Sequence, residues 1–253
     1  MFNKILLIEN NISFANAVSS SLESTLNTTV DMIQDYSNIN FQSIINYDLY
    51  IIRLDELTKE TIKYLSNLER LILVLANEDT KETRKKILSL NITDYIITNS
   101  KASPQEISTI SKNLDNNSHK TILAVDDSKL ALIQISMILG TQNLNYIQCS
   151  NGEEAWEYLK KSNAKKIDLV VTDYEMPVMN GYELVKKIRT KFSLEELPVL
   201  VISGTEDSFM ISKFLKAGAN DYINKPFIHE EFIARITNSL SLASMFSKIK
   251  IWL

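Results

Sequence analysis

The sequence predicts an α/β protein of two tandem, doubly wound (βα)5 units, each with a five-stranded parallel sheet. Short apolar runs of strand type alternate with helix-like segments along the chain, which is typical of parallel sheets covered by helices. The pattern repeats with a period near half the chain, and Asp94-Tyr95-Ile96 recurs as Asp221-Tyr222-Ile223. All five glycines lie in the second half, so composition also divides the chain into two parts.

Strands in the second half are followed at once by helices. The predicted strands span 121–125, 145–149, 168–172, 198–203 and 221–224, and the predicted helices span 128–139, 152–161, 181–191, 207–217 and a long segment from about 229. Gly140 and Gly218 stand where two of these helices end, as glycine often does. The polar run 113–119 suits a linker. We therefore expect one domain over 1–118 and another over 119–253.

The first half shows the same order of elements. Its predicted strands span 5–8, 29–33, 48–52, 71–75 and 94–97, and its predicted helices lie near 12–26, 37–45, 58–67, 79–90 and 104–115. Five strand–helix pairs of this length again favour a parallel sheet with helices on both faces.

The composition is that of a globular chain, with 45% hydrophobic and 23% charged residues among 253. No apolar run reaches the roughly 18 residues of a membrane span, and the N-terminal run is too short for a signal peptide. A single cysteine, Cys149, excludes a disulfide framework and suits a reducing cytoplasm. The net charge of −4 gives no basic surface for nucleic acid. We expect a cytoplasmic protein that binds neither membranes nor nucleic acid.

Polar side chains follow the predicted strands of the second half: Asp126 and Asp127, Asp173, Ser203 and Lys225. Parallel strands bring their carboxyl ends to one edge of a sheet, so these groups should meet. Clustered carboxylates raise one another's pKa unless a cation holds them, and oxygen ligands suit Mg²⁺. An ammonium and a hydroxyl beside a nucleophilic carboxylate point to phosphoryl transfer. Strand-end acids that merely cap the following helices are the simpler alternative.

On these residues, 119–253 resembles a response-regulator receiver domain with the flavodoxin-like fold. Asp126-Asp127 match the acidic pair of that family, Asp173 the phospho-accepting aspartate, and Lys225-Pro226 the lysine and its cis proline. Ser203 and Tyr222 match the hydroxyl and the aromatic side chain of the switch, while Met176-Pro177 and Asn180-Gly181 match the loop after the acceptor.

The resemblance implies two-component signalling, in which Asp173 accepts a phosphoryl group from a histidine kinase or phosphotransfer protein. It implies a Mg²⁺ requirement, with Asp126, Asp127, Asp173 and the backbone carbonyl of Glu175 as ligands. Lys225 would then hold a phosphoryl oxygen, and Ser203 and Tyr222 would rearrange. The chain would be a self-phosphorylating receiver protein rather than an enzyme with an output domain.

Residues 1–118 resemble the same fold without its chemistry. Glu9-Asn10 replaces the acidic pair, Arg53 the acceptor, Ala76 the switch hydroxyl, and Thr98-Asn99 the Lys-Pro pair. We expect Arg53 to pair with Glu9. The alternative is that Arg53 stands in for the charge of a metal and locks one conformation.

Two other functions fit parts of the sequence. Tandem receivers with a long last helix resemble the front half of diguanylate cyclase response regulators, so the chain could be the regulatory fragment of such a protein. A phosphatase of the haloacid dehalogenase type also uses a strand-end aspartate with an acid two residues on, where Glu175 stands. A scaffold that is never phosphorylated is a third reading, disfavoured by the complete set of five groups.

The receiver family often dimerises after phosphorylation through the fourth helix, fifth strand and fifth helix. Asp221 and Arg235 resemble the intermolecular ion pairs of that face, so we expect a homodimer through the second receiver. The alternative is that the two residues are solvated or pair within one chain.

Overall fold

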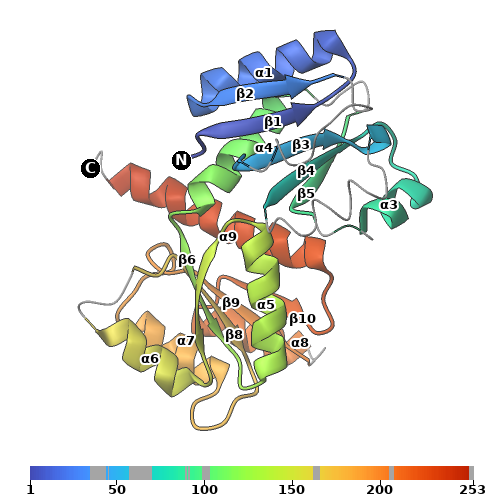
Figure 1. Cartoon of the computed structure of the whole chain (residues 1–253). Helices are drawn as coiled ribbons and strands as arrows, with labels where there is room; N and C mark the ends of the chain where they lie inside the picture. Colours follow the sequence, from blue (N-terminus) through green and yellow to red (C-terminus); the bar gives the residue numbers. More distant parts are fainter. Residues whose placement is uncertain are drawn as a thin grey trace. The chain divides into compact units, whose positions relative to one another are not determined.

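The structure is a computed structural model that describes residues 1–34, 44, 46–56, 70–88, 90, 92–98, 103–161, 166–204 and 208–250 (Figure 1). The chain forms two compact units. The first unit contains Met1–Ser118 together with Thr141–Asn143, and the second contains His119–Gly140 and Leu144–Leu253. Each unit is built around one parallel sheet of five strands.

In the first unit the strands are ordered β2-β1-β3-β4-β5. They are β1 (Lys4–Ile8), β2 (Thr29–Ile33), β3 (Leu49–Arg53), β4 (Leu71–Ala76) and β5 (Asp94–Ile97). The helices are α1 (Ile12–Leu26), the 3-10 turn η3 (Leu54–Glu56), α3 (Lys81–Leu88) and α4 (Pro104–Asn117). The predicted helices 37–45 and 58–67 lie outside the described residues, apart from Ile44.

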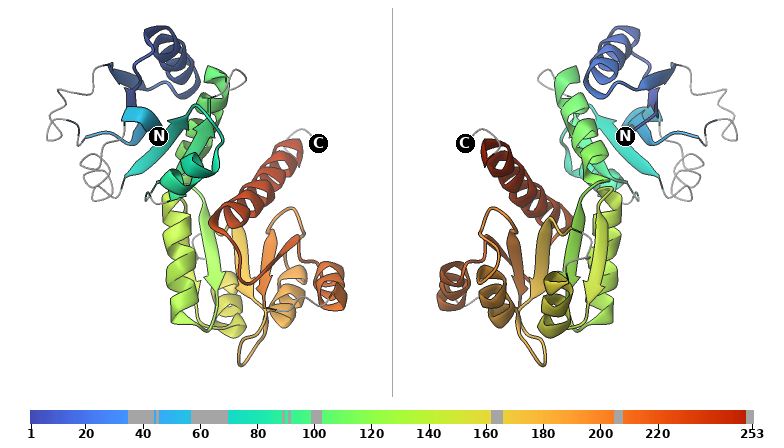
Figure 2. Two further views of the ribbon diagram at one scale, coloured as in Figure 1. Left: turned by 90° about the vertical axis from the view of Figure 1, so that its right-hand side faces the viewer. Right: turned by 90° about the vertical axis from the view of Figure 1, so that its left-hand side faces the viewer.

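The second unit repeats this order as β10-β9-β8-β6-β7. Its strands are β6 (Thr121–Val125), β7 (Asn145–Cys149), β8 (Leu169–Asp173), β9 (Val199–Ser203) and β10 (Asp221–Asn224). Its helices are α5 (Lys129–Thr141), α6 (Gly152–Lys160), α7 (Gly181–Arg189), α8 (Ser208–Ala217) and α9 (His229–Lys250), and α9 is a single long ribbon in both views of Figure 2.

The central strands of both units are buried on both faces, because they carry apolar side chains at consecutive positions. In the second unit, alternate strand residues pack with α5 and α9 on one face, including Leu132 and Phe232. On the other face they pack with α6, α7 and α8, including Leu184 and Phe214. These two layers fix the carboxyl ends of β6, β8, β9 and β10 relative to one another.

The predicted fold is confirmed: each unit is doubly wound, with the strand order 2-1-3-4-5 of flavodoxin-like proteins. Predicted and observed elements differ by at most two residues at their ends within the described part of the chain. Across the described residues, we find no helix that combines the length and the apolar character needed to cross a membrane.

Candidate phosphoryl-acceptor site

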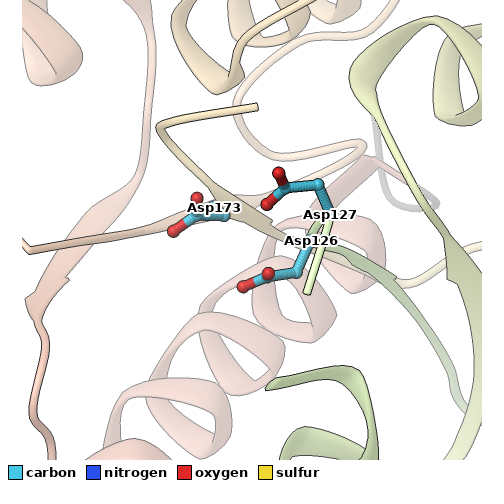
Figure 3. A group of neighbouring side chains, drawn as sticks. All are labelled: Asp126, Asp127 and Asp173. Carbon is cyan, nitrogen blue, oxygen red and sulfur yellow. The ribbon is translucent and has the colours of Figure 1, made fainter. Parts of the chain in front are cut away.

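Three carboxylates meet at the carboxyl edge of the second sheet. Asp126 and Asp127 follow β6, and Asp173 is the last residue of β8, the neighbouring strand. One oxygen from each acid lies within 4.8 Å of the others (Figure 3). Asp126 and Asp173 are buried, with 1% and 7% of their surface exposed, whereas Asp127 faces solvent. This geometry can bind a hard cation from the solvent side through oxygen ligands.

Lys225 connects the two buried acids. Its Nζ donates to Asp126 Oδ2 at 2.9 Å and to Asp173 Oδ1 at 2.6 Å. Burial raises the pKa of the Asp173 carboxyl above its ordinary value, although the hydrogen bond from Lys225 opposes the rise. Burial alone would lower the pKa of the Lys225 ammonium, but its bonds to Asp173 and Asp126 outweigh that effect and raise it. The ammonium is therefore held in its charged form against the Asp173 carboxyl group.

Backbone amides orient the remaining oxygens of the buried acids. Asp126 Oδ1 accepts from the Ser128 amide at 2.9 Å, and Asp173 Oδ2 accepts from the Glu175 amide at 3.1 Å. Both carboxylates are thus fixed by the turns that follow their own strands.

Ser203 and Tyr222 lie on β9 and β10, beside Lys225. Ser203 ends β9 with 1% of its surface exposed, and its carbonyl accepts from the Lys225 amide at 2.7 Å. Tyr222 is buried, and its hydroxyl donates to Asn224 Oδ1. Its ring stacks on Phe214 with centroids 5.9 Å apart. The predicted switch aromatic therefore occupies an interior position between β10 and α8.

The loop after Asp173 packs closely against the backbone of Asp173. A Cβ on Gly181 would lie 2.2 Å from the Asp173 carbonyl oxygen, so no larger residue fits there without a shift. Asn180 and Glu183 form a capping box that starts α7 at this point. Between them and the acceptor, Val178 has φ +69° and is 82% exposed. A β-branched residue in the left-handed region is strained.

The equivalent edge of the first unit is closed by a buried ion pair. Arg53 donates from Nε to Glu9 Oε2 at 2.8 Å, and its Nη2 contacts the same oxygen. Its Nη1 donates to Asn77 Oδ1 at 2.9 Å and to the Thr98 hydroxyl. The predicted pairing of Arg53 with Glu9 is confirmed. A guanidinium from β3 thereby ties the carboxyl ends of β1, β4 and β5 together.

The predicted dimer residues pair within one chain. Arg235 Nη1 lies 2.8 Å and 2.9 Å from the two carboxylate oxygens of Asp221, and its Nη2 lies 3.1 Å from Glu231 Oε1. This is the alternative that the sequence left open. An ion pair across a dimer would have to replace this contact of Nη1 with both Asp221 oxygens, so the intermolecular pairing remains a prediction.

Three contributors were not anticipated from sequence: Phe214, Asn224 and Asn77. Asn77 and Asn224 stand at the carboxyl ends of β4 and β10, so the rule that found Asp173 could have found them. Phe214 has no polar group and lies within a helix, and its stacking partner follows only from the packing of α8 on β10. Cys149 is buried, as expected of a core thiol, and burial raises its pKa to about 12.

The model of the response regulator receiver domain family matches residues 122–237. The chemotaxis protein CheY homolog of Campylobacter jejuni is 32% identical over 124 residues, which are 49% of this chain and 94% of that protein. The chain belongs to the response regulator receiver family. The rice two-component response regulator ORR5 is 37% identical over 105 residues, 42% of this chain and 77% of that protein.

A solved structure described as a two-component system response regulator/GGDEF domain protein resembles both units together. It is 25% identical, with a TM-score of 0.80 over 96% of this chain and 99% of that one. A second structure of the same description has 24% identity and the same TM-score, and it shows the fold alone. The chain is therefore a tandem receiver protein of two-component signalling.

Proposed function

We propose that Asp173 accepts a phosphoryl group from a histidine kinase or phosphotransfer protein and that this switches the second receiver. The observation that carries the proposal is the position of Asp173: it ends β8 beside two further acids and under the Lys225 ammonium. An oxygen of Asp173 attacks phosphorus, and the bond from phosphorus to the donor nitrogen breaks with its electron pair leaving on the imidazole.

Mg²⁺ is the cofactor that the acids fit best, since three close carboxylates repel one another and offer only oxygen. Asp126, Asp127, Asp173 and the backbone carbonyl of Glu175 would hold it, and the bound ion would neutralise charge on the phosphoryl oxygens. The chain's own part is orientation, because the amides of Ser128 and Glu175 already fix one oxygen of each buried acid.

The switch rests on three groups next to the acceptor. Lys225 already touches Asp173 and would transfer one hydrogen bond to a phosphoryl oxygen. Ser203 is buried at the end of the adjacent strand and would donate its hydroxyl. Tyr222 belongs to the same strand as Asn224 and stacks on Phe214, so movement of β9 and α8 would reach it.

The first unit, residues 1–118, is proposed as a degenerate receiver with a docking or regulatory role, followed by the active receiver over 119–253. Arg53 occupies the strand end that carries the acceptor in the second unit, and it is already bound to Glu9. That pair supports a stable fold without phosphotransfer.

The remaining proposals follow from the family. We propose that the protein is cytoplasmic and that neither nucleic acid nor membrane is its partner. We also propose a homodimer through the face that holds Asp221 and Arg235.

The likeness to response regulator/GGDEF proteins supports the alternative that this chain is the regulatory part of a diguanylate cyclase regulator. The phosphatase alternative has the Asp173–Glu175 spacing in its favour and would require repeated turnover.

The test is mass spectrometry after incubation with acetyl phosphate, with and without Mg²⁺. One phosphoryl group per chain is expected, lost in Asp173→Asn and kept in Asp168→Asn, which removes an acid just before the start of the same strand. Labelling of residues 1–118 in Asp173→Asn would contradict the assignment. Continuous release of phosphate from a small phosphate ester would instead favour the phosphatase.

A further inference from the structure

Helices α7 and α8 of the second unit line a groove. Its volume is about 550 Å³, which is in the range of small-molecule sites. Tyr182 and Lys186 face it from successive turns of α7, and Phe209, Lys213 and Lys216 from successive turns of α8. We call this the α7–α8 groove. Figure 1 shows the two helices on the lower part of the second unit.

Two ammonium groups from the lining of this groove contact the same aromatic ring. Lys213 Nζ lies 4.6 Å and Lys186 Nζ 5.7 Å from the centroid of Tyr182. Lys216 adds a third cation one turn beyond Lys213. Within the described part of the chain, none of these three lysines forms an ion pair. An anion that enters the groove would therefore be attracted to all three ammonium groups.

Further features favour a phosphorylated ligand. Ser212 adds a hydroxyl to the lining, and ammonium groups with a hydroxyl are suited to phosphate oxygens, whereas the Thr190 hydroxyl already donates to the Lys187 carbonyl at 2.6 Å. Phe209 lies at the rim with 72% of its surface exposed, which offers an apolar face for a planar group. Arg189 also lines the groove, but its guanidinium is held by the carbonyls of Gly218 and Leu197 and therefore shapes the wall.

We propose that the α7–α8 groove binds a small phosphorylated ligand of the nucleotide class, with phosphates on the three lysines and the planar ring against Phe209. The groove is linked to the switch through aromatic rings. Tyr182 lies 6.4 Å from Phe214, which stacks on Tyr222. A bound ligand would thus restrain the α8 side of the switch.

The test is isothermal titration calorimetry of the whole chain with ATP and with pyrophosphate, in EDTA so that the acids hold no metal. Lys186→Gln/Lys213→Gln should weaken both ligands at least tenfold. The matched control is Lys160→Gln/Lys187→Gln, which removes the same charge from lysines that already pair with Glu157 and Glu153. It should change either dissociation constant by less than twofold.

Phe209→Ala separates the two parts of the ligand: it should weaken ATP severalfold and leave pyrophosphate unchanged. Far-UV circular dichroism and labelling of Asp173 by acetyl phosphate should be the same in all variants, which excludes misfolding. The proposal is overturned if neither ligand binds at millimolar concentration, or if the control weakens binding as much as the groove variant. Tighter binding of a hexaglutamate peptide than of ATP would overturn the ligand class and mark the groove as a surface for acidic protein segments.

Discussion

Removal of the Arg53 guanidinium should destabilise the first unit strongly. Arg53 and Glu9 have 7% and 1% of their side chains exposed, and the guanidinium also binds Asn77 and Thr98. Arg53→Ala would leave the Glu9 carboxylate buried without its partner. Breaking a buried pair on one side costs about 3–5 kcal/mol of unfolding free energy. A loss of this size is a large share of the stability of one domain.

The measurement is hydrogen exchange of the β1 and β3 amides in the whole chain, supported by urea denaturation. Exchange that proceeds by unfolding of the first unit should speed up by a factor of 100 or more, roughly the equivalent of 3 kcal/mol. Amides of β6 and β8 should be unaffected, because they belong to the second sheet.

Two further variants identify the cause. Arg84→Ala removes an arginine that pairs with Asp79 on the surface, with side chains 57% and 45% exposed, and should leave exchange in β1 and β3 unchanged. Glu9→Gln/Arg53→Met replaces both charges by neutral groups of similar size and should recover most of the loss. If Arg53→Ala alone changed exchange less than fivefold, the buried pair would not be what holds these strand ends together.

Three substitutions and one test of thiol reactivity also have defined outcomes. Gly181→Ala should destabilise the second unit and reduce labelling of Asp173, because its Cβ would press on the acceptor's carbonyl, whereas Gly140→Ala, with open space around its Cβ, should stabilise α5 by about 0.5–1 kcal/mol in thermal denaturation. Val178→Asn should raise the melting temperature by a few degrees, since asparagine tolerates φ +69° and the exposed valine buries little. Cys149 should resist iodoacetamide at pH 8.5 in the folded chain and react after unfolding, because burial raises its pKa to about 12 and keeps the thiol protonated.

The fold could be predicted because its signals are local. Apolar runs such as Leu169-Val170-Val171 predict buried strands, and polar residues directly after them mark the strand ends. Polar residues that directly follow parallel strands lie at the same edge of a sheet. This rule predicted that Asp126 and Asp173 lie close together, and it also predicted the contact between Arg53 and Glu9.

What the sequence could not predict depends on side-chain packing. Nothing in the spacing of Lys225 shows that it bridges two acids before any phosphoryl group arrives. The contact of Arg235 Nη1 with both carboxylate oxygens of Asp221 also depends on rotamers and distance, which a residue pattern leaves open. Lys186 and Lys213 lie on separate helices, and both reach the ring of Tyr182 only when α7 packs against α8.

The two strand-end networks differ in their charge balance. In the first unit, the buried Glu9 carboxylate faces one guanidinium, so that pair is neutral as folded and has no electrostatic need for an ion. In the second unit, three carboxyl groups share one ammonium, so the acids outnumber the cation at the sheet edge. A divalent cation would offset that excess of acids. One fold thus holds one strand-end network whose charges pair within the chain and another whose acids outnumber the cation that binds them.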